Sequence, residues 1–295
     1  MRWEGDRQSD NVEDRRGEGG GGGGGFGFGG GTVGIGTIVI ALLGSWFFGV
    51  SPSTIINLLS GGGGAPAHVQ QQQAPSRAPA NDREGQFVHT VLAYTEDTWT
   101  QIFRANGATY KAPVLVLYDG RTSTGGCGTG QSAVGPFYCP ADRKVYIDLS
   151  FFRLMQQRFH VSGEFPQAYV IAHEVGHHVQ NLLGISGKVD SARERLSETQ
   201  ANALSVRVEL QADCFAGVWA QHTNQAKQII ETGDVDAALA AATAIGDDAL
   251  QRQSRGEVVP DSFTHGSSAQ RVRWFKRGLE TGSVEQCNTF EARQL

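Results

Sequence analysis

The chain has 295 residues, enough for one large domain or two small ones, and 39% of them are hydrophobic. Its formal net charge is -5, from 25 Lys and Arg against 30 Asp and Glu, and the basic residues form no stripe. This composition argues against nucleic acid as a partner, because binding a phosphate backbone needs a basic surface. Glycine is over-represented, with 40 residues, and much of the excess lies near the N-terminus.

The first 31 residues predict a disordered, glycine-rich tail. Residues 1–18 are charged and carry few apolar side chains, and 19–31 are glycine interrupted only by Phe26 and Phe28. A sequence of this kind forms no stable helix and buries no core. The range 1–31 is therefore expected to lie outside any folded domain.

Residues 32–50 read TVGIGTIVIALLGSWFFGV, a stretch without a charge. Its 19 residues match the length of one helix across a bilayer, and glycine is tolerated in such helices. The alternative is a cleaved secretory signal, because the APA at 65–67 resembles a cleavage site. That site lies well past the apolar stretch, and the charged leader is long, so an uncleaved transmembrane helix is favoured.

The distribution of arginines predicts the orientation of this span. Arg2, Arg7, Arg15 and Arg16 precede it, whereas the first basic residue after it is Arg77. Positively charged flanks stay in the cytoplasm, so the N-terminus is expected there. The rest of the chain would then be periplasmic or extracellular, in a single-pass protein of the cell membrane.

Residues 51–81 are rich in Gly, Gln, Ala and Pro and predict a flexible linker, which places a folded domain at 82–295. Apolar residues at three- and four-residue spacing predict a helix near the start of this domain, and the runs at 113–118 and 145–149 predict a buried and a half-buried strand. From about Phe165 the pattern is helical. Few strands followed by many helices indicate an α+β fold, mostly helical with a small sheet.

All four cysteines fall in this domain, and an even number in an exported domain predicts disulfides. Four cysteines allow three connectivities. Cys127 and Cys139 bracket a glycine-rich loop and make a plausible local pair, which would leave Cys214 with Cys287. The alternative is a zinc site made of cysteines, but the spacing lacks C-x-x-C pairs.

An H-E-x-x-H motif lies within the predicted helix that begins near Phe165. On a helix His173 and His177 lie one turn apart on one face, where both can bind a single zinc ion. Glu174 is turned about 100° from His173, beside the metal, where it can take a proton from water. His178 points away from that face. The alternative of chance histidines on an ordinary helix applies to roughly one such chain in a hundred.

A catalytic zinc needs a third protein ligand. Glu209 and Asp213 are four residues apart on a helix predicted over 191–225, among increasingly apolar neighbours. Buried carboxylates need partners. Zinc would satisfy Glu209, and Asp213 could accept the N–H of a zinc-binding histidine. The alternative is a carboxylate pair neutralised by Arg207 or another base.

The stretch FTHGSSAQRVRWF contains a capping box at 267–270, with His265 in the loop before the helix and Arg271 in its first turn. A peptidase needs a donor for the oxyanion that develops on the attacked carbonyl. His265 or Arg271 is predicted to serve as this catalytic donor. The alternative is that His265 is a loop hydrogen-bonder and that Arg271 pairs with an acidic residue such as Asp247 or Asp248.

With these motifs the chain resembles the gluzincin peptidases and, more closely, the family of neutral zinc metallopeptidases. The matching stretches are TEDTW, GCGTGQSAVGPFYCP, AHEVGHHVQ, ELQADCFAGVWA and FTHGSSAQRVRWF, over residues 85–290. The resemblance implies a zincin-like fold and peptidase activity. It also implies that His173, His177 and Glu209 bind zinc and that Glu174 is the general base.

The chain is thus predicted to be a membrane-anchored zinc metallopeptidase that cleaves a peptide or protein substrate, with Glu174 as base toward a metal-activated water. The strand at 145–151 is a candidate edge for pairing with an extended peptide. One alternative is a non-catalytic, zinc-containing binding module of the cell envelope, which would not need Glu174. Another is a zinc amidase acting on cell-wall peptide.

Overall fold

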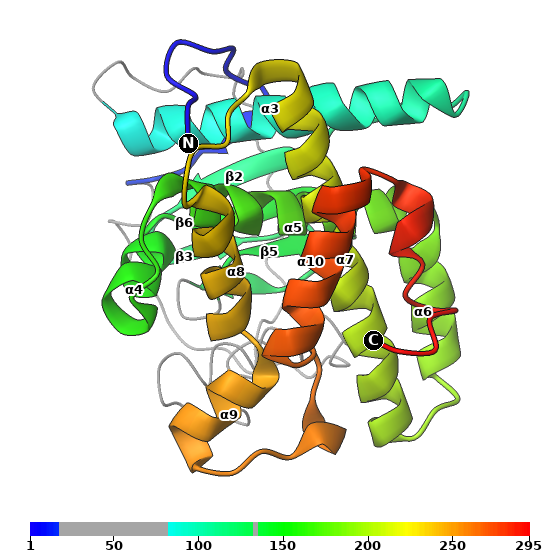
Figure 1. Ribbon diagram of the computed structural model, residues 1–295. Helices are drawn as coiled ribbons and strands as arrows, with labels where there is room; N and C mark the ends of the chain where they lie inside the picture. The colour runs from blue at the N-terminus through cyan, green and yellow to red at the C-terminus, as the bar shows by residue number, and fades with distance from the viewer. Residues whose placement is uncertain (18–81, 132–134) are drawn as a thin grey trace, which may run out of the picture.

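The computed structural model describes residues 1–17, 82–131 and 135–295, and it shows a mixed α+β fold that is mostly helical with a small sheet, as predicted (Figure 1). The helices are α3 (Arg83–Ala105), α4 (Ser150–Phe159), α5 (Glu164–Leu182), α6 (Ile185–Arg193), α7 (Glu198–Lys227), α8 (Asp234–Ala244), α9 (Asp247–Arg255), α10 (Ser268–Thr281) and the short 3-10 turns η3 (Pro260–Ser262) and η4 (Val284–Cys287). The strands are β1 (Val12–Asp14), β2 (Val114–Tyr118), β3 (Arg121–Ser123), β4 (Thr129–Gln131), β5 (Phe137–Cys139) and β6 (Lys144–Asp148).

The main sheet has the order β1-β2-β6-β5, with β1, β2 and β6 parallel and β5 antiparallel to β6. Strands β3 and β4 form a separate hairpin. The strand predicted over 145–149 corresponds to β6, which lies inside the sheet and has both faces covered. Leu117 and Ile147 face the helices, whereas Val116, Tyr146 and Phe137 belong to a smaller cluster on the other side. The prediction that 145–151 offers an edge was therefore wrong, and the edge on that side is β5.

Three helices pack closely, α5 against α7 and α7 against α10. A Cβ on Gly176 of α5 would approach the backbone of Ala212 on α7 to 3.1 Å. A Cβ on Gly217 of α7 would lie 2.1 Å from the carbonyl oxygen of Phe275 on α10. Glycine at these positions lets the backbones come together. As a result, polar side chains from all three helices meet in one place.

Both expected disulfides are present, and the connectivity that the sequence left open is Cys127–Cys139 and Cys214–Cys287. The first joins the loop before β4 to β5, and the second joins α7 to η4 across 73 residues of sequence. No cysteine in the described residues is free. Two disulfides are typical of a domain that folds outside a reducing cytosol.

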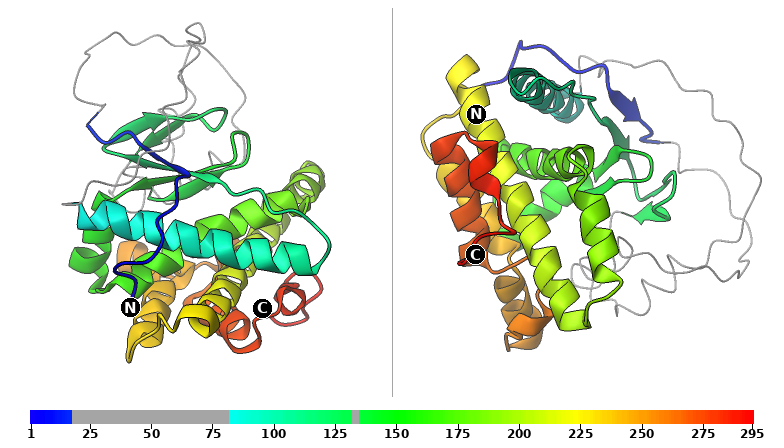
Figure 2. Two further views of the ribbon diagram at one scale, coloured as in Figure 1. Left: turned by 90° about the horizontal axis from the view of Figure 1, so that it is seen from above. Right: turned by 90° about the vertical axis from the view of Figure 1, so that its right-hand side faces the viewer.

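The N-terminal segment, residues 1–17, differs from the expected disordered tail. Strand β1 pairs with β2, and Val12 and Trp3 are buried. Trp3 packs edge-to-face on Phe87 of α3, with ring centroids 5.4 Å apart. Figure 2 shows this segment crossing α3 to reach the sheet. The remainder of the range expected to be disordered, 18–31, lies outside the described residues.

The charges of the N-terminal segment explain the wrong prediction. They suggested a solvated tail, but they have partners in the domain: Arg7 donates to Glu96 of α3 at 3.0 Å, and Lys144 of β6 donates to Glu13 at 2.6 Å. Composition alone could not reveal these partners, because they lie more than 80 residues away in the sequence. The segment is part of the domain that was predicted to begin at residue 82.

The pairing of β1 with β2 bears on the predicted membrane topology. A single-pass orientation puts residues 1–17 and 82–295 on opposite sides of a membrane, whereas here they share one sheet. An ion pair between Arg16 and Asp82 also joins the end of the N-terminal segment to the residue that precedes α3. The transmembrane helix predicted at 32–50 and the linker predicted at 51–81 lie outside the described residues. Among the helices that are described, none combines the length and apolar character needed to cross a bilayer.

Candidate metal centre

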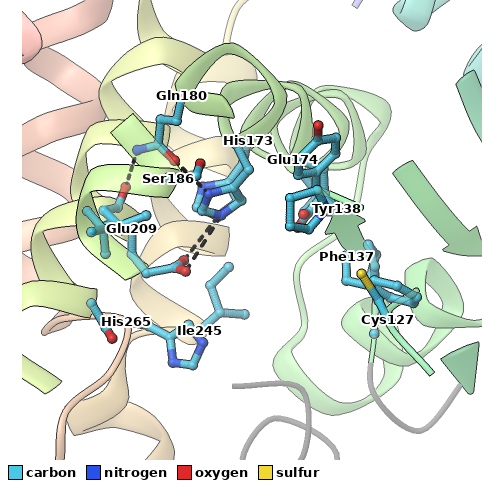
Figure 3. A pocket seen from close by; sticks show the side chains of 18 of the residues that line it. Cys127, Phe137, Tyr138, His173, Glu174, Gln180, Ser186, Glu209, Ile245 and His265 are labelled. Atoms are coloured by element: carbon cyan, nitrogen blue, oxygen red, sulfur yellow. Dashed lines mark hydrogen bonds and ion pairs between the residues drawn. The ribbon is translucent and has the colours of Figure 1, made fainter. Parts of the chain in front are cut away.

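Three side chains from two helices converge on one point. His173 and His177 lie one turn apart on α5, and their Nε2 atoms are 3.2 Å from each other. Glu209 of α7 approaches both, with its carboxylate oxygens 3.3 Å from Nε2 of His173 and 3.6 Å from Nε2 of His177. Figure 3 shows Glu209 pointing toward His173. These residues are the group that the sequence predicted, and their ligand atoms all lie within 4.8 Å of one another.

Each histidine is oriented by a partner on its other ring nitrogen. Nδ1–H of His173 donates to Asp213 at 2.9 Å, and Nδ1–H of His177 donates to Oε1 of Gln180 at 2.9 Å. Gln180 is itself fixed, because its amide nitrogen donates to the carbonyl oxygen of Val208 at 2.7 Å. With Nδ1 protonated, each neutral ring presents the lone pair of Nε2 to the convergence point.

Asp213 occupies the predicted position behind His173 and is completely buried. Arg271 of α10 binds it in a bidentate pair, with both N···O distances 2.9 Å, and the hydroxyl of Tyr169 donates to it at 2.6 Å. Burial raises the pKa of Asp213, but the Arg271 cation and the hydrogen bond from His173 outweigh it and hold that pKa below its ordinary value. Asp213 is therefore ionised and fixes the ring of His173.

Arg271 pairs with an acidic residue, as the alternative to the donor role predicted, but with a different one from those named. It lines the cavity, but its guanidinium is directed to Asp213 rather than to Asp247 or Asp248. A cation held in this bidentate geometry fixes the position of Asp213 and, through it, the position of His173. We therefore treat Arg271 as a positioning residue.

His265 lies in the loop between η3 and α10 and is held by Asp247. One carboxylate oxygen of Asp247 accepts the backbone N–H groups of Thr264, His265 and Gly266 at 2.6–3.0 Å, and the other lies 3.2 Å from Nδ1 of His265. Nε2 of His265 is buried, lines the cavity and has no hydrogen-bond partner among the described residues. Burial lowers the pKa of His265, but Asp247 outweighs it and raises that pKa above the ordinary value.

The three ligand residues, together with Arg271 and His265, line a cavity of about 370 Å³. Glu174 lines it as well, and burial raises the pKa of this carboxyl group above its ordinary value. Strand β5 forms another wall with Phe137 and Tyr138, and α6 contributes Ser186 and Val189. The cavity therefore combines the three converging ligand atoms, a buried carboxyl group, a histidine donor and an apolar wall.

His178 lies away from the convergence point, as predicted. Its Nε2–H donates to the carbonyl oxygen of Lys111 at 2.6 Å, and its Nδ1 lies 3.1 Å from the hydroxyl of Tyr138. Burial lowers the pKa of His178 to about 4, so the ring is neutral. It joins the β5 wall of the cavity to α5.

Sequence reasoning missed Gln180, Tyr169 and the pairing of Asp247 with His265. The sequence does hold a signal for the first two. Gln180 follows His177 by three residues and Tyr169 precedes His173 by four, so each lies on the same helix face as a metal-binding histidine. No such spacing links Asp247 to His265.

The family described as "Putative neutral zinc metallopeptidase" matches residues 1–290 of this chain. The chain belongs to this family. It is 53% identical over 292 residues to the uncharacterised protein YpfJ of Escherichia coli K12. The matched region covers 98% of this chain and 99% of the relative. It is 39% identical over 244 residues to an uncharacterised protein of Mycobacterium tuberculosis H37Rv. Here the matched region covers 78% of this chain and 81% of the relative. No solved structure matches it.

As a member of the zinc metallopeptidase family the protein uses zinc, and its residues fit this ion. Tetrahedral zinc with bonds of about 2.0–2.2 Å separates its ligand atoms by roughly 3.3–3.6 Å, which agrees with the 3.2–3.6 Å between the ligand atoms of His173, His177 and Glu209. Burial raises the pKa of Glu209, but His177 and His173 outweigh it and hold that pKa well below its ordinary value. A buried carboxylate beside two imidazoles is a donor set suited to a divalent cation.

Proposed function

We propose that this protein is a peptidase that hydrolyses peptide bonds in the cavity between β5 and α6. The observation that carries the proposal is the combination of the His173, His177 and Glu209 ligand set with the buried carboxyl group of Glu174 in one cavity. Zinc held there would supply a Lewis acid for the scissile carbonyl and would lower the pKa of a nearby water.

Glu174 is the general base in this mechanism. Its carboxylate takes a proton from the attacking water and then delivers it to the nitrogen of the leaving amine. The raised pKa of this group favours proton uptake. A module that only bound zinc would have no use for a buried carboxyl group beside the ligands, so Glu174 favours an enzyme over the non-catalytic alternative.

His265 is the donor for the oxygen that becomes negatively charged during the attack. Its Nε2 has no hydrogen-bond partner in the described part of the chain and lines the cavity, while Asp247 holds Nδ1 from behind. Asp247 also favours the protonated ring, which donates through Nε2. An oriented donor of this kind stabilises the transition state more than the ground state.

An extended substrate is proposed to pair with the outer edge of β5. This strand is at the edge of the main sheet and its residues Phe137 and Tyr138 line the cavity. Edge pairing would supply backbone hydrogen bonds that are independent of sequence, and the aromatic wall would contact apolar side chains. Strand β6 has no edge available for this role.

The protein is proposed to act outside the cytoplasm at the cell membrane. The two disulfides support an oxidising compartment. The apolar stretch at 32–50 supports attachment to the membrane. The pairing of β1 with β2 supports placing the N-terminal segment on the same side as residues 82–295, so the proposed attachment through 32–50 would not be a single crossing.

The test compares the full-length wild type, Glu174→Gln and the control Glu194→Gln on a diverse peptide library. Glu194 is exposed and does not line the cavity. Zinc content is measured on the same samples. Glu174→Gln is expected to retain one zinc per chain and to lose at least about a hundredfold in kcat/KM, while Glu194→Gln behaves as wild type. Equal cleavage by Glu174→Gln and wild type would contradict the mechanism, and no cleavage by any zinc-loaded sample would contradict the function.

A further inference from the structure

Arg193, the last residue of α6, is a cavity-lining cation with no role in the chemistry described above. Its side chain lines the same cavity as Glu174 and Glu209. Its Nε atom is inaccessible to solvent and has no hydrogen-bond partner among the described residues. An unpaired buried donor on a permanently charged group costs more free energy than one that is paired. The side chain as a whole is only partly buried and lines the cavity, so the terminal nitrogens of its guanidinium, rather than Nε, are the atoms that can meet a partner arriving with the substrate.

The other cations of the cavity already have partners. Arg271 is bound by Asp213, and His265 is held by Asp247. Burial lowers the pKa of Arg193, and the negative charges of Asp190 and Glu209 act in the opposite direction. A guanidinium is nevertheless charged at any pH relevant to proteins. In the described chain, Arg193 is thus the cavity-lining cation left without a bound carboxylate.

Asp190 does not satisfy Arg193. It lies one turn earlier on α6 and also lines the cavity, but within the described part of the chain its charge acts on Arg193 without a hydrogen bond or ion pair between the two. Asp190 is exposed, so water screens its charge. Glu209 is committed to the metal under the proposed function. Neither acid therefore competes strongly with an incoming carboxylate.

We propose that Arg193 selects substrates that carry a carboxylate close to the scissile bond. This inference rests on the proposed function, because the cavity is taken to be the peptidase site. Guanidinium binds carboxylate through two parallel hydrogen bonds, which gives both affinity and orientation. The cavity of about 370 Å³ is near the small end of ligand sites, so a group bound at Arg193 lies close to the bond over the metal centre. The carboxylate is either an acidic side chain or the free C-terminus of a peptide.

Two matched pairs of quenched fluorescent peptides distinguish these sources. In the first pair a Glu is replaced by Gln and both C-termini are amidated. In the second pair the sequence is neutral and the C-terminus is either a free acid or an amide. The full-length wild type is expected to cleave the acid member of one pair at least about tenfold better in kcat/KM, as expected for a hydrogen bond to a charged group. The pair that shows the preference identifies the source.

Three variants test whether Arg193 causes that preference. Arg193→Gln is expected to bring the acid-to-neutral ratio of kcat/KM close to one, and Arg193→Glu to reverse it in favour of the neutral member. The control Arg195→Gln, at an exposed position outside the cavity, is expected to keep the wild-type ratio. No preference in wild type, or the same preference in Arg193→Gln, would overturn the proposal.

A binding measurement separates this proposal from the proposed function. Zinc-loaded Glu174→Gln protein is titrated into the same labelled peptides, and fluorescence anisotropy gives the Kd without turnover. The acid member of a pair is expected to bind about tenfold tighter, and Arg193→Gln in the same background should abolish that difference. If no peptide is cleaved but the difference is found, the peptidase function fails and the carboxylate site stands. If peptides are cleaved but bind without the difference, the carboxylate site fails alone.

Discussion

The metal centre and the N-terminal segment both depend on charged side chains, but they hold them in opposite environments. At the metal centre, Asp213 and Arg271 are almost completely buried, with exposed fractions of 0% and 3%. In the N-terminal segment, the side chain of Arg7 is 48% exposed, and it pairs with Glu96 and Asp97 on α3.

Burial decides what each set of charges contributes. A buried pair gains little net stability over an apolar pair, but removing one partner leaves an unpaired buried charge, which costs several kcal/mol. An exposed pair contributes between about 0 and 1 kcal/mol. The N-terminal segment is therefore expected to be held chiefly by Trp3, Val12 and the β1–β2 ladder, whereas the metal centre depends on each member of its charge network.

The largest expected effect is the all-or-none outcome of cross-linking in intact cells. Cysteines are introduced by Arg16→Cys and Asp82→Cys, whose native side chains form an ion pair, and a short bismaleimide that does not cross the cytoplasmic membrane is added. The linked peptides should be found by mass spectrometry if the N-terminal segment and the domain share the outer side. A protein carrying only Arg16→Cys is the control. No link with the double variant, together with labelling at position 82 alone, would favour the single-pass orientation.

The next largest effect concerns the buried network. Arg271→Met should lower the free energy of unfolding by about 3–5 kcal/mol, because the buried Asp213 carboxylate loses the cation that neutralises it. Zinc content should also fall, since Asp213 positions His173. Lys276→Met, at an exposed position on the same helix, should change stability by less than about 0.5 kcal/mol. Chemical denaturation of both variants gives the comparison, and equal stabilities would show that the network contributes no more than an exposed charge.

The spacing of residues along a helix determines how much of this network could be predicted from the sequence. Spacing along one helix placed His173 with His177 and Glu209 with Asp213 on common faces, and the structure brings these faces together. It could not show which residues of separate helices meet, so the partner of Arg271 was missed. That contact depends on the close approach of α7 to α10.

The N-terminal segment could not be predicted from the sequence for a different reason. Three residues of β1 are too few for a periodic pattern. The strand is recognisable only beside β2, which lies about a hundred residues further along the chain. Residues 1–17 and 82–295 therefore read as separate regions although they pack together. The sequence also could not show which of β5 and β6 lies at the edge of the sheet, because an interior and an edge strand of this length have similar composition.

The third prediction concerns the apolar anchor of the N-terminal segment. Trp3 packs on Phe87, and its indole N–H donates to Glu164 at 2.8 Å. Trp3→Ala should lower the free energy of unfolding by about 3 kcal/mol, the usual cost of removing a buried tryptophan. Trp3→Phe should recover most of that loss, and zinc content should stay at one per chain in both variants. A loss of zinc in Trp3→Ala would mean that the segment also supports the metal centre, and the contrast between the two regions would fail.

The smallest expected effect is that of a partly exposed ion-pair network and its dependence on pH. Arg16 pairs with Asp14 and Asp82. Burial raises the pKa of both carboxyl groups, but their bonds to Arg16 outweigh it and leave each pKa below its ordinary value of 3.8. Because a depressed pKa stabilises the folded state only while the group is ionised, this contribution is present above about pH 4 and is lost as the pH falls through the folded-state values.

Arg16→Gln should therefore destabilise the protein by about 1 kcal/mol or less at pH 7, and the difference from wild type should shrink as the pH falls below 4. Added salt should reduce the difference at pH 7, because these side chains are partly exposed and their charges are screened. Denaturation curves of wild type and Arg16→Gln at several pH values measure both trends. A loss at pH 7 as large as that of Arg271→Met, with no dependence on salt, would show that the N-terminal segment depends on its charges as strictly as the buried metal centre does.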